Sequence, residues 1–278
     1  MLEALHMLSL PGNPAKPNDD AFCHSNHLAA VFDGATGLGE QILPVDSDAA
    51  WIARRGTEGL ILHESENPRE TLRAAASDAE IAFNALRQRP PAETYEIPFA
   101  SMMFITERAN TLEALWFGDC AALIKRPGEN VQIIGDAMQK RTEESARVAA
   151  LAKARNLAPT AGPSRTEYLP ALRAARNRVN TKDGSWLFSP DASCADHAHH
   201  QTIPAPKGTD ILLLTDGFLA LTSDYNRYTT DALLDAAQKG LRPLYNELRE
   251  IEFADPEGRN YPRFKQSDDA TAILLRVV

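Results

Sequence analysis

The most informative segments of this chain are two short apolar runs that each end in Asp-Gly: Leu28-Ala-Ala-Val-Phe-Asp33-Gly34 and Ile211-Leu-Leu-Leu-Thr-Asp216-Gly217. An uninterrupted run of this length is typical of a strand buried on both faces, and glycine allows a sharp backbone turn after it. Each strand therefore carries a carboxylate at its end. A single aspartate in such a place is most often a turn residue, whereas several on adjacent strand ends indicate a shared site.

Further acidic positions flank these two runs. Asp19-Asp20 lie near the start of the chain, Asp119 follows the apolar run 115–117 and Gly118, and Asp268-Asp269 lie near the end. Gathered carboxylates repel one another and raise each other's pKa unless cations neutralise them. Oxygen ligands favour hard ions such as Mg²⁺ or Mn²⁺. We therefore predict a carboxylate-rich metal site whose ligands are scattered along the whole sequence.

The composition is that of a globular protein with a sizeable core: 278 residues, 44% hydrophobic and 24% charged. A net charge of −9 argues against a general nucleic-acid binder. Three widely spaced cysteines without a CxxC motif suit a reducing compartment. The first residues do not resemble a signal peptide, and no window approaches the ~18 apolar residues of a membrane helix. We predict a cytoplasmic protein that binds neither nucleic acid nor membranes.

Capping residues and apolar spacing predict the main helices and strands. Ser47 or Asp48 caps a helix that reaches about His63, and Asn67 with Pro68 begins another that ends before Pro90-Pro91. Further helices are expected at 230–239 and 242–251. Strands are expected at 28–33, 185–188, 211–215 and 270–278, and an antiparallel meander at 99–106, 112–117, 121–125 and 131–134. We predict one domain, 1–278, of α+β class.

The segment 139–182 differs from the rest in charge. It holds ten lysines and arginines against three glutamates, so it carries +7 while the remainder carries −16. Its composition is helical, and Pro159, Pro163 and Pro170 are expected to break it. We interpret it as a helical flap inserted over one end of the sheet. A solvated helical face explains the charge, and the alternative is a phosphoprotein-facing surface with Arg173, Arg176 and Arg178 as its best candidates.

Taken in order, these segments resemble the metal-dependent protein phosphatases of the protein phosphatase 2C-like family. The match covers nearly the whole chain, from Lys16 to the C-terminus. The matching elements are Lys16-Pro-Asn-Asp19-Asp20, Val31-Phe-Asp33-Gly34, Phe99-Ala-Ser101, Phe117-Gly118-Asp119-Cys120, Thr215-Asp216-Gly217-Phe218 and Asp268-Asp269-Ala270-Thr271.

This resemblance implies a four-layer α-β-β-α sandwich of two mainly antiparallel sheets. It also implies that Asp33 bridges two Mn²⁺ or Mg²⁺ ions, that the Gly34 carbonyl binds one of them, and that Asp216 and Asp268 complete the other shell. Asp19 and Asp20 would hold water molecules of the ions, and Lys16 would bind the phosphate. The implied reaction is hydrolysis of phosphoserine or phosphothreonine in a phosphoprotein substrate by a water that the two ions activate.

Several positions depart from the family pattern. Lys16 stands where the family has arginine, and Ala35 stands where many members have the histidine that protonates the leaving group. For a third ion Asp119 is present, but its partner position is Ala220, with Asp224 as a substitute four residues further on. Two alternatives stay open, namely a pseudophosphatase that acts as a binding module and a hydrolase of small phosphate esters.

The histidines of Asp196-His-Ala-His199-His200 suggest a zinc site, but no second half of suitable spacing accompanies them. We therefore expect a solvated polar loop at 196–200.

Overall fold

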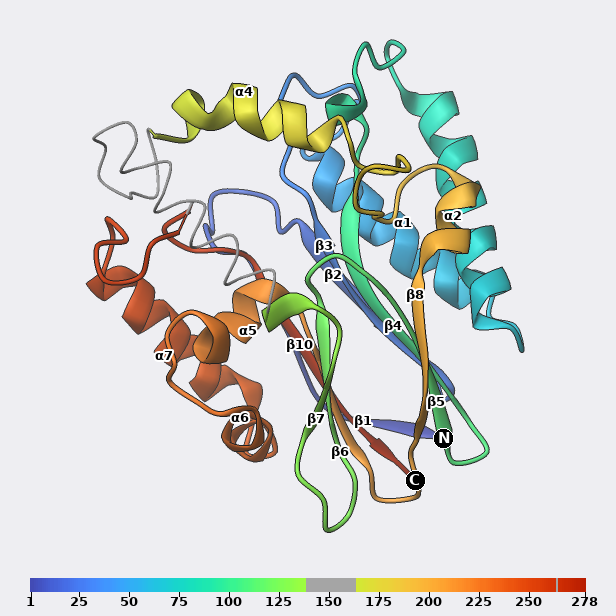
Figure 1. Ribbon diagram of the computed structural model, residues 1–278, viewed down its shortest axis with the longest axis vertical. Helices are drawn as coiled ribbons and strands as arrows, with labels where there is room; N and C mark the ends of the chain where they lie inside the picture. Colours follow the sequence, from blue (N-terminus) through green and yellow to red (C-terminus); the bar gives the residue numbers. More distant parts are fainter. Residues whose placement is uncertain (139–163, 264) are drawn as a thin grey trace.

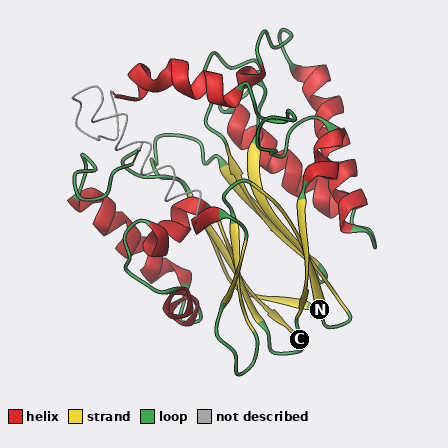
Figure 2. Cartoon of the chain, in the orientation of Figure 1, coloured by secondary structure: helices red, strands yellow, loops and turns green. Residues whose placement is uncertain are grey.

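Two five-stranded sheets packed face to face form the centre of the molecule (Figures 1 and 2). The computed structural model describes residues 1–138, 164–263 and 265–278, so the first part of the predicted flap, 139–163, lies outside the described residues. Every ladder in both sheets is antiparallel. The strand order is β1-β10-β9-β6-β7 in the first sheet and β2-β3-β4-β5-β8 in the second.

The strands have the following bounds. The first sheet consists of β1 (Leu2–Leu10), β10 (Ala270–Val277), β9 (Asp210–Leu214), β6 (Ala121–Lys125) and β7 (Gln132–Ile134). The second consists of β2 (Asp20–His24), β3 (Leu28–Gly34), β4 (Ala100–Arg108), β5 (Thr111–Phe117) and β8 (His199–Pro204).

Helices cover the outer face of each sheet, as Figure 2 shows. The second sheet is covered by α1 (Asp48–Leu62) and α2 (Pro68–Leu86), and the first by α5 (Asp216–Ser223), α6 (Thr230–Ala237) and α7 (Leu241–Ala254). The helix α4 (Ser164–Arg176) and the 3₁₀ turns η1 (Thr94–Glu96) and η2 (Ala192–His197) complete the described elements. The predicted α-β-β-α sandwich is confirmed.

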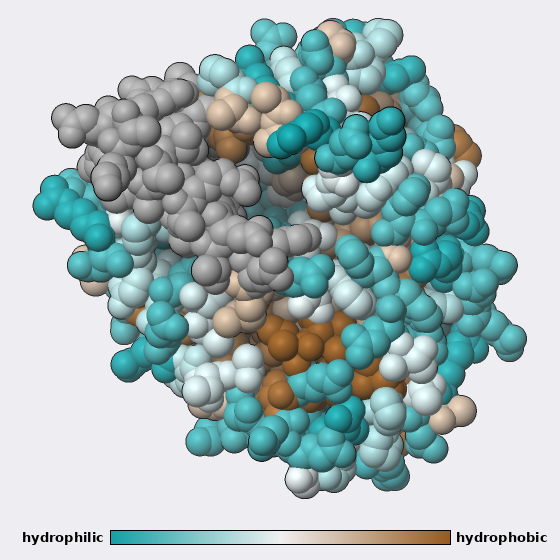
Figure 3. Space-filling view, viewed as in Figure 1, coloured by the Kyte–Doolittle hydropathy of each residue, from teal (hydrophilic) through white to brown (hydrophobic). Residues whose placement is uncertain are grey.

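The uninterrupted apolar runs reflect strands that are buried on both faces. In β3, Leu28, Ala30 and Phe32 pack towards α1 and α2, while Ala29 and Val31 pack between the two sheets. The strands β9 and β10 divide in the same way between the helix-covered core and the core between the sheets. Alternate side chains of a strand point to opposite faces, so covering both faces requires every position to be apolar. At lower centre in Figure 3, apolar side chains of this interior reach the surface between the edge strands β7 and β8.

Both predicted helix caps are confirmed. The Ser47 hydroxyl accepts from the Ala50 N–H at the start of α1, and the Asn67 side chain accepts from the Arg69 and Glu70 N–H groups at the start of α2. Pro68 occupies the first helical position, where no N–H is needed.

Other predictions of local structure were wrong. The meander is split, because the chain crosses from β5 in one sheet to β6 in the other at 118–120. The strand expected at 185–188 is an isolated bridge between Phe188 and Ala100. Pro170 lies inside α4 rather than ending it. The strands β1, β2 and β8 and the helix α5 were not predicted.

Among the described helices, none combines the length and the apolar character needed to cross a membrane.

Candidate metal centre

The predicted acidic positions meet because the strands that carry them end at one edge of the sandwich. Asp20 opens β2 and faces Asp33, near the end of β3, in the antiparallel ladder. In the other sheet, Asp216 follows β9, and Asp268 precedes the neighbouring strand β10. The Thr215 N–H donates to the Thr271 carbonyl at 3.0 Å, which holds these two strand ends together.

Asp33 is the centre of this group. Burial raises its pKa well above the usual range, and the carboxylates of Asp216, Asp20, Asp119 and Asp268 raise it further. These neighbours come from both sheets and from the crossing between them. The negative charge is therefore concentrated around Asp33, which is the position to which the family resemblance assigns a bridge between two ions.

Asp20 connects the two sheets through a hydrogen bond. Its carboxylate is buried and accepts from the Thr215 hydroxyl at 2.8 Å. Burial raises the pKa of Asp20 well above its usual range, and the Asp269 and Asp268 charges act in the same direction.

Asp19 is held at the entrance of α1. The Ser47 hydroxyl donates to the Asp19 carboxylate at 2.5 Å, and the Asp19 carbonyl accepts from the Gly34 N–H at 3.0 Å. Burial is the main cause of the raised pKa of Asp19. The Asp19 backbone thus lies beside the Asp33-Gly34 pair, and the family resemblance implies a supporting role for this residue.

Asp268 and Asp269 have different surroundings. Both oxygens of Asp269 accept backbone hydrogen bonds, from the Gly12 N–H at 2.7 Å and the Asp19 N–H at 2.6 Å. The Asp268 Oδ1 lies 2.6 Å from the Lys265 ammonium. Asp269 therefore fixes the N-terminal loop, whereas Asp268 already faces a cation.

The glycines after Asp33 and Asp216 are needed for close backbone approach, which differs from the sharp turn predicted from the sequence. A methyl group at Gly34 would collide with the carbonyl of Ala49, and one at Gly217 would collide with the carbonyl of Asp269. Neither glycine is among those with a positive φ. The small residue thus brings helix and strand backbones together around each carboxylate.

The third-ion candidates are not gathered in the same way. Asp119 is half-buried and its charge acts on Asp33. Ala220 is buried in α5, and Asp224 follows the end of that helix, where the Ser223 hydroxyl donates to its carboxylate at 3.1 Å.

A groove of about 970 Å³ opens beside the acidic cluster. Asp19, Asp268 and Asp269 line it, and the exposed Lys16 lies on its wall. Two further basic residues of this wall, Lys265 and Arg176, were not predicted to lie beside the acidic cluster. The only sequence signal for Lys265 is its position three residues before Asp268.

The histidines of 196–200 are not a loop but belong to η2 and the edge strand β8. The His197 ring stacks on Trp186 with centroids 3.4 Å apart, and the His199 ring stacks on Trp116 at 5.3 Å. The His200 ring pairs with the Glu113 carboxylate across the ladder. Aromatic and ionic contacts therefore account for all three rings.

The donor chemistry of the acidic cluster fits hard divalent cations. It offers buried carboxylate oxygens and backbone carbonyls, with no sulfur or imidazole among the predicted ligands. In the part of the chain that the structure describes, no three Asp, Glu, His or Cys side chains already form a complete ligand set.

Comparison with known proteins gives structural matches only. No family model and no curated protein matches the chain. The Mycobacterium tuberculosis serine/threonine phosphatase PstP/Ppp is 16% identical with a TM-score of 0.60, covering 99% of this chain and 98% of that one. The catalytic domain of PstP in complex with two manganese ions is 15% identical with a TM-score of 0.56, over 100% and 98%.

A third match, RsbX in complex with magnesium, is 13% identical with a TM-score of 0.50 over the full length of both chains. Together with the layers and ladders described above, these matches show that the chain has the fold of the metal-dependent serine/threonine phosphatases.

Proposed function

We propose that this protein is a Mn²⁺- or Mg²⁺-dependent phosphatase of the protein phosphatase 2C-like family, acting on phosphoserine or phosphothreonine in proteins. The observation that supports it most is the position of Asp33, half-buried among carboxylates from both sheets next to an open groove. A fold alone does not specify a reaction, so the proposal depends on this site.

Asp33, Asp216, Asp268 and the Gly34 carbonyl would hold two divalent ions, like the two manganese ions bound by PstP. Such ions, when bound, supply an activated water and offset the charge of the phosphate. The protein residues supply the rest of the site. Thr215 and Ser47 orient the carboxylates of Asp20 and Asp19, and Asp269 holds the N-terminal loop against the site.

The groove favours a phosphorylated side chain on a protein over a small buried ligand. It is open along the loops 12–19 and 35–49, and its walls carry Lys16, Lys265 and Arg176. A basic side chain meets a phosphate through charge-assisted hydrogen bonds. Lys16 is exposed on this wall, and it is the residue to which the family resemblance assigns the phosphate contact.

A Mn²⁺ titration of activity on a phosphothreonine peptide and on a small aryl phosphate, measured side by side, tests this proposal. We expect metal-dependent turnover of the peptide, with Asp33→Asn inactive at the same metal concentration. Turnover of the aryl phosphate alone would identify a small-ester hydrolase. Mn²⁺ binding without turnover of either compound would identify a pseudophosphatase.

A further inference from the structure

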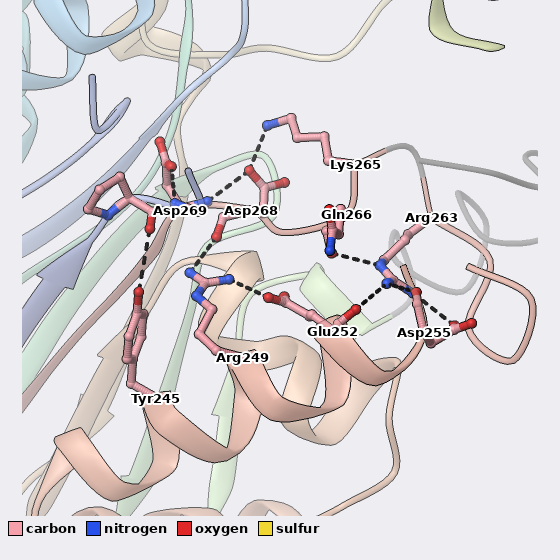
Figure 4. Close-up of polar contacts among 11 residues, drawn as sticks. Tyr245, Arg249, Glu252, Asp255, Arg263, Lys265, Gln266, Asp268 and Asp269 are labelled. Atoms are coloured by element: carbon pink, nitrogen blue, oxygen red, sulfur yellow. Dashed lines mark hydrogen bonds and ion pairs between the residues drawn. The ribbon is translucent and has the colours of Figure 1, made fainter. Parts of the chain in front are cut away.

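Lys265 places an ammonium group at the acidic cluster (Figure 4). Its Nζ lies 2.6 Å from Asp268 Oδ1, three residues along the same loop. Burial alone would lower the pKa of Lys265, but the carboxylates of Asp268, Asp33 and Asp216 outweigh it and hold the pKa above the usual range. The ammonium therefore pairs directly with Asp268, and the more distant charges of Asp33 and Asp216 also attract it.

The loop that carries Lys265 is fixed on both sides. Arg263 pairs with Asp255 at 3.1 Å, and its Nε donates to the Gln266 carbonyl at 2.9 Å. Beyond the lysine, the buried Arg249 of α7 donates to the Asp268 carbonyl at 2.6 Å and pairs with Glu252 at 2.5 Å. Figure 4 shows this series of contacts from α7 to the start of β10. Since its backbone is held, the Lys265 side chain stays within reach of the cluster.

An ammonium and a divalent ion cannot both lie close to Asp268 without strong mutual repulsion. Whichever cation is present neutralises the same carboxylates. Lys16 differs, because its side chain is exposed and makes no ion pair among the described residues. Of the two lysines on the groove wall, only Lys265 can act as a counter-ion of the cluster.

We propose that Lys265 is a tethered counter-cation that competes with divalent metal for the Asp33, Asp216 and Asp268 carboxylates and thereby sets the metal affinity of the centre. This inference depends on the proposed function, since it concerns the same metal site. Metal binding displaces the ammonium from Asp268 towards the groove. The protein consequently needs a higher metal concentration than it would need without the Lys265 charge. In return, the Lys265 charge makes the metal-free protein more stable.

The test compares the full-length protein with Lys265→Met, which removes the charge, and Lys265→Arg, which keeps it. Lys207→Met is the matched control, because Lys207 is exposed and precedes β9, at the opposite end of that strand from Asp216. Calorimetry gives the Mn²⁺ dissociation constant, and thermal unfolding in EDTA gives the stability without metal.

For Lys265→Met we expect Mn²⁺ affinity to increase on the order of tenfold, as when a like charge near an ionisable site is removed. Its unfolding temperature in EDTA should fall, because three carboxylates lose their counter-ion, while Lys265→Arg and Lys207→Met remain close to wild type. Equal or weaker Mn²⁺ affinity in Lys265→Met would refute the competition. Absence of Mn²⁺ binding in the wild type would instead refute the proposed function. The calorimetric titration of the wild type alone distinguishes this outcome from a failure of the Lys265 proposal.

Discussion

At the scale of single residues, the carboxylates of this protein differ in whether they already have a cation. Burial and like charges raise the pKa of Asp33 and Asp20. Glu96 is the opposite case, because two hydrogen bonds from Arg89, at 2.8 and 2.9 Å, lower its pKa to about 2. The ion pair of Glu96 with Arg89 therefore stabilises the groove wall without a bound metal ion. The carboxylates around Asp33, in contrast, repel one another until positive charge is added.

The lowered pKa of Glu96 predicts a defined pH dependence. A carboxylate whose pKa is lower in the folded state than its ordinary value of 4.5 contributes stability above pH 4.5, and this is lost as the pH falls towards 2. Glu96→Gln should therefore unfold at a lower temperature than wild type at pH 7, with the difference shrinking as the pH falls below 4.5. Thermal unfolding in EDTA across this range measures it, and Glu250→Gln, on the exposed face of α7, is the control. A difference independent of pH would contradict this role.

At the scale of elements, the strand-to-helix junctions determine where the carboxylates lie. Gly217 lies in the first turn of α5 against the Asp269 carbonyl, and Gly34 lies against the Ala49 carbonyl of α1. In both cases a backbone carbonyl occupies the space that a side chain would need. The Asp-Gly pair thus couples the position of a ligand to the packing of a helix.

Gly217→Ala should destabilise the protein by about 1–3 kcal/mol, the usual cost of forcing an extra carbon into a packed site. It should also weaken Mn²⁺ binding, because the backbone of Asp269, next to Asp268, must move. Gly37→Ala is the control for stability, since nothing lies within 4 Å of its added methyl group. Chemical denaturation and calorimetry check both effects, and similar behaviour of the two variants would refute the role of close approach.

The helix α4 is attached to the groove through Arg173. Its Nε donates to the Leu38 carbonyl at 2.8 Å, and its guanidinium lies over the Tyr95 ring at 4.9 Å. Of the three arginines predicted to face a phosphoprotein, Arg173 is therefore engaged within the chain, Arg176 lines the groove and Arg178 is exposed. A substrate-recruiting role of the flap stays a prediction, and Arg178 is the arginine best placed to test it.

Arg173→Ala should loosen α4, since it removes one hydrogen bond and one cation–π contact, together worth about 1–2 kcal/mol. Hydrogen exchange of the backbone amides in 164–176 should become faster, whereas Arg178→Ala should leave it unchanged. If Arg173→Ala exchanged like wild type, the attachment of α4 would have to come from other contacts.

How much the sequence predicts depends on how deeply an element is buried. The strands β3, β9 and β10 were predicted because both of their faces require apolar residues, and α1 and α2 because their caps are side chains. The edge strand β8 was missed because His199-His200-Gln-Thr is largely exposed and carries no apolar alternation. The helix α5 was not predicted because it begins directly at Asp216, and the Asp216-Gly217 pair was interpreted only as the end of the preceding strand.

At the scale of the whole molecule, the sandwich brings together residues from both ends of the chain. The Asp19 N–H bonds to the Asp269 carboxylate, although 250 residues separate them. Asp33, Asp119, Asp216 and Asp268 were predictable as candidates because each adjoins a predicted strand, whereas Asp19 and Asp20 adjoin the unpredicted β2 and were identified from the order of the motifs alone. Lys265 was not predicted, because its importance comes from the contacts of α7 with the loop before β10, which no local pattern records.

In the proposed site, carboxylates from the two sheets together hold divalent ions at one edge of the sandwich. Calorimetric titration of EDTA-treated protein with Mn²⁺, in wild type and in Asp33→Asn, tests it most directly, with circular dichroism to verify the fold of the variant. We expect two ions in the wild type and the loss of at least one, with weakened binding of the other, in Asp33→Asn. Identical titration curves for the two folded proteins would show that Asp33 is not a metal ligand.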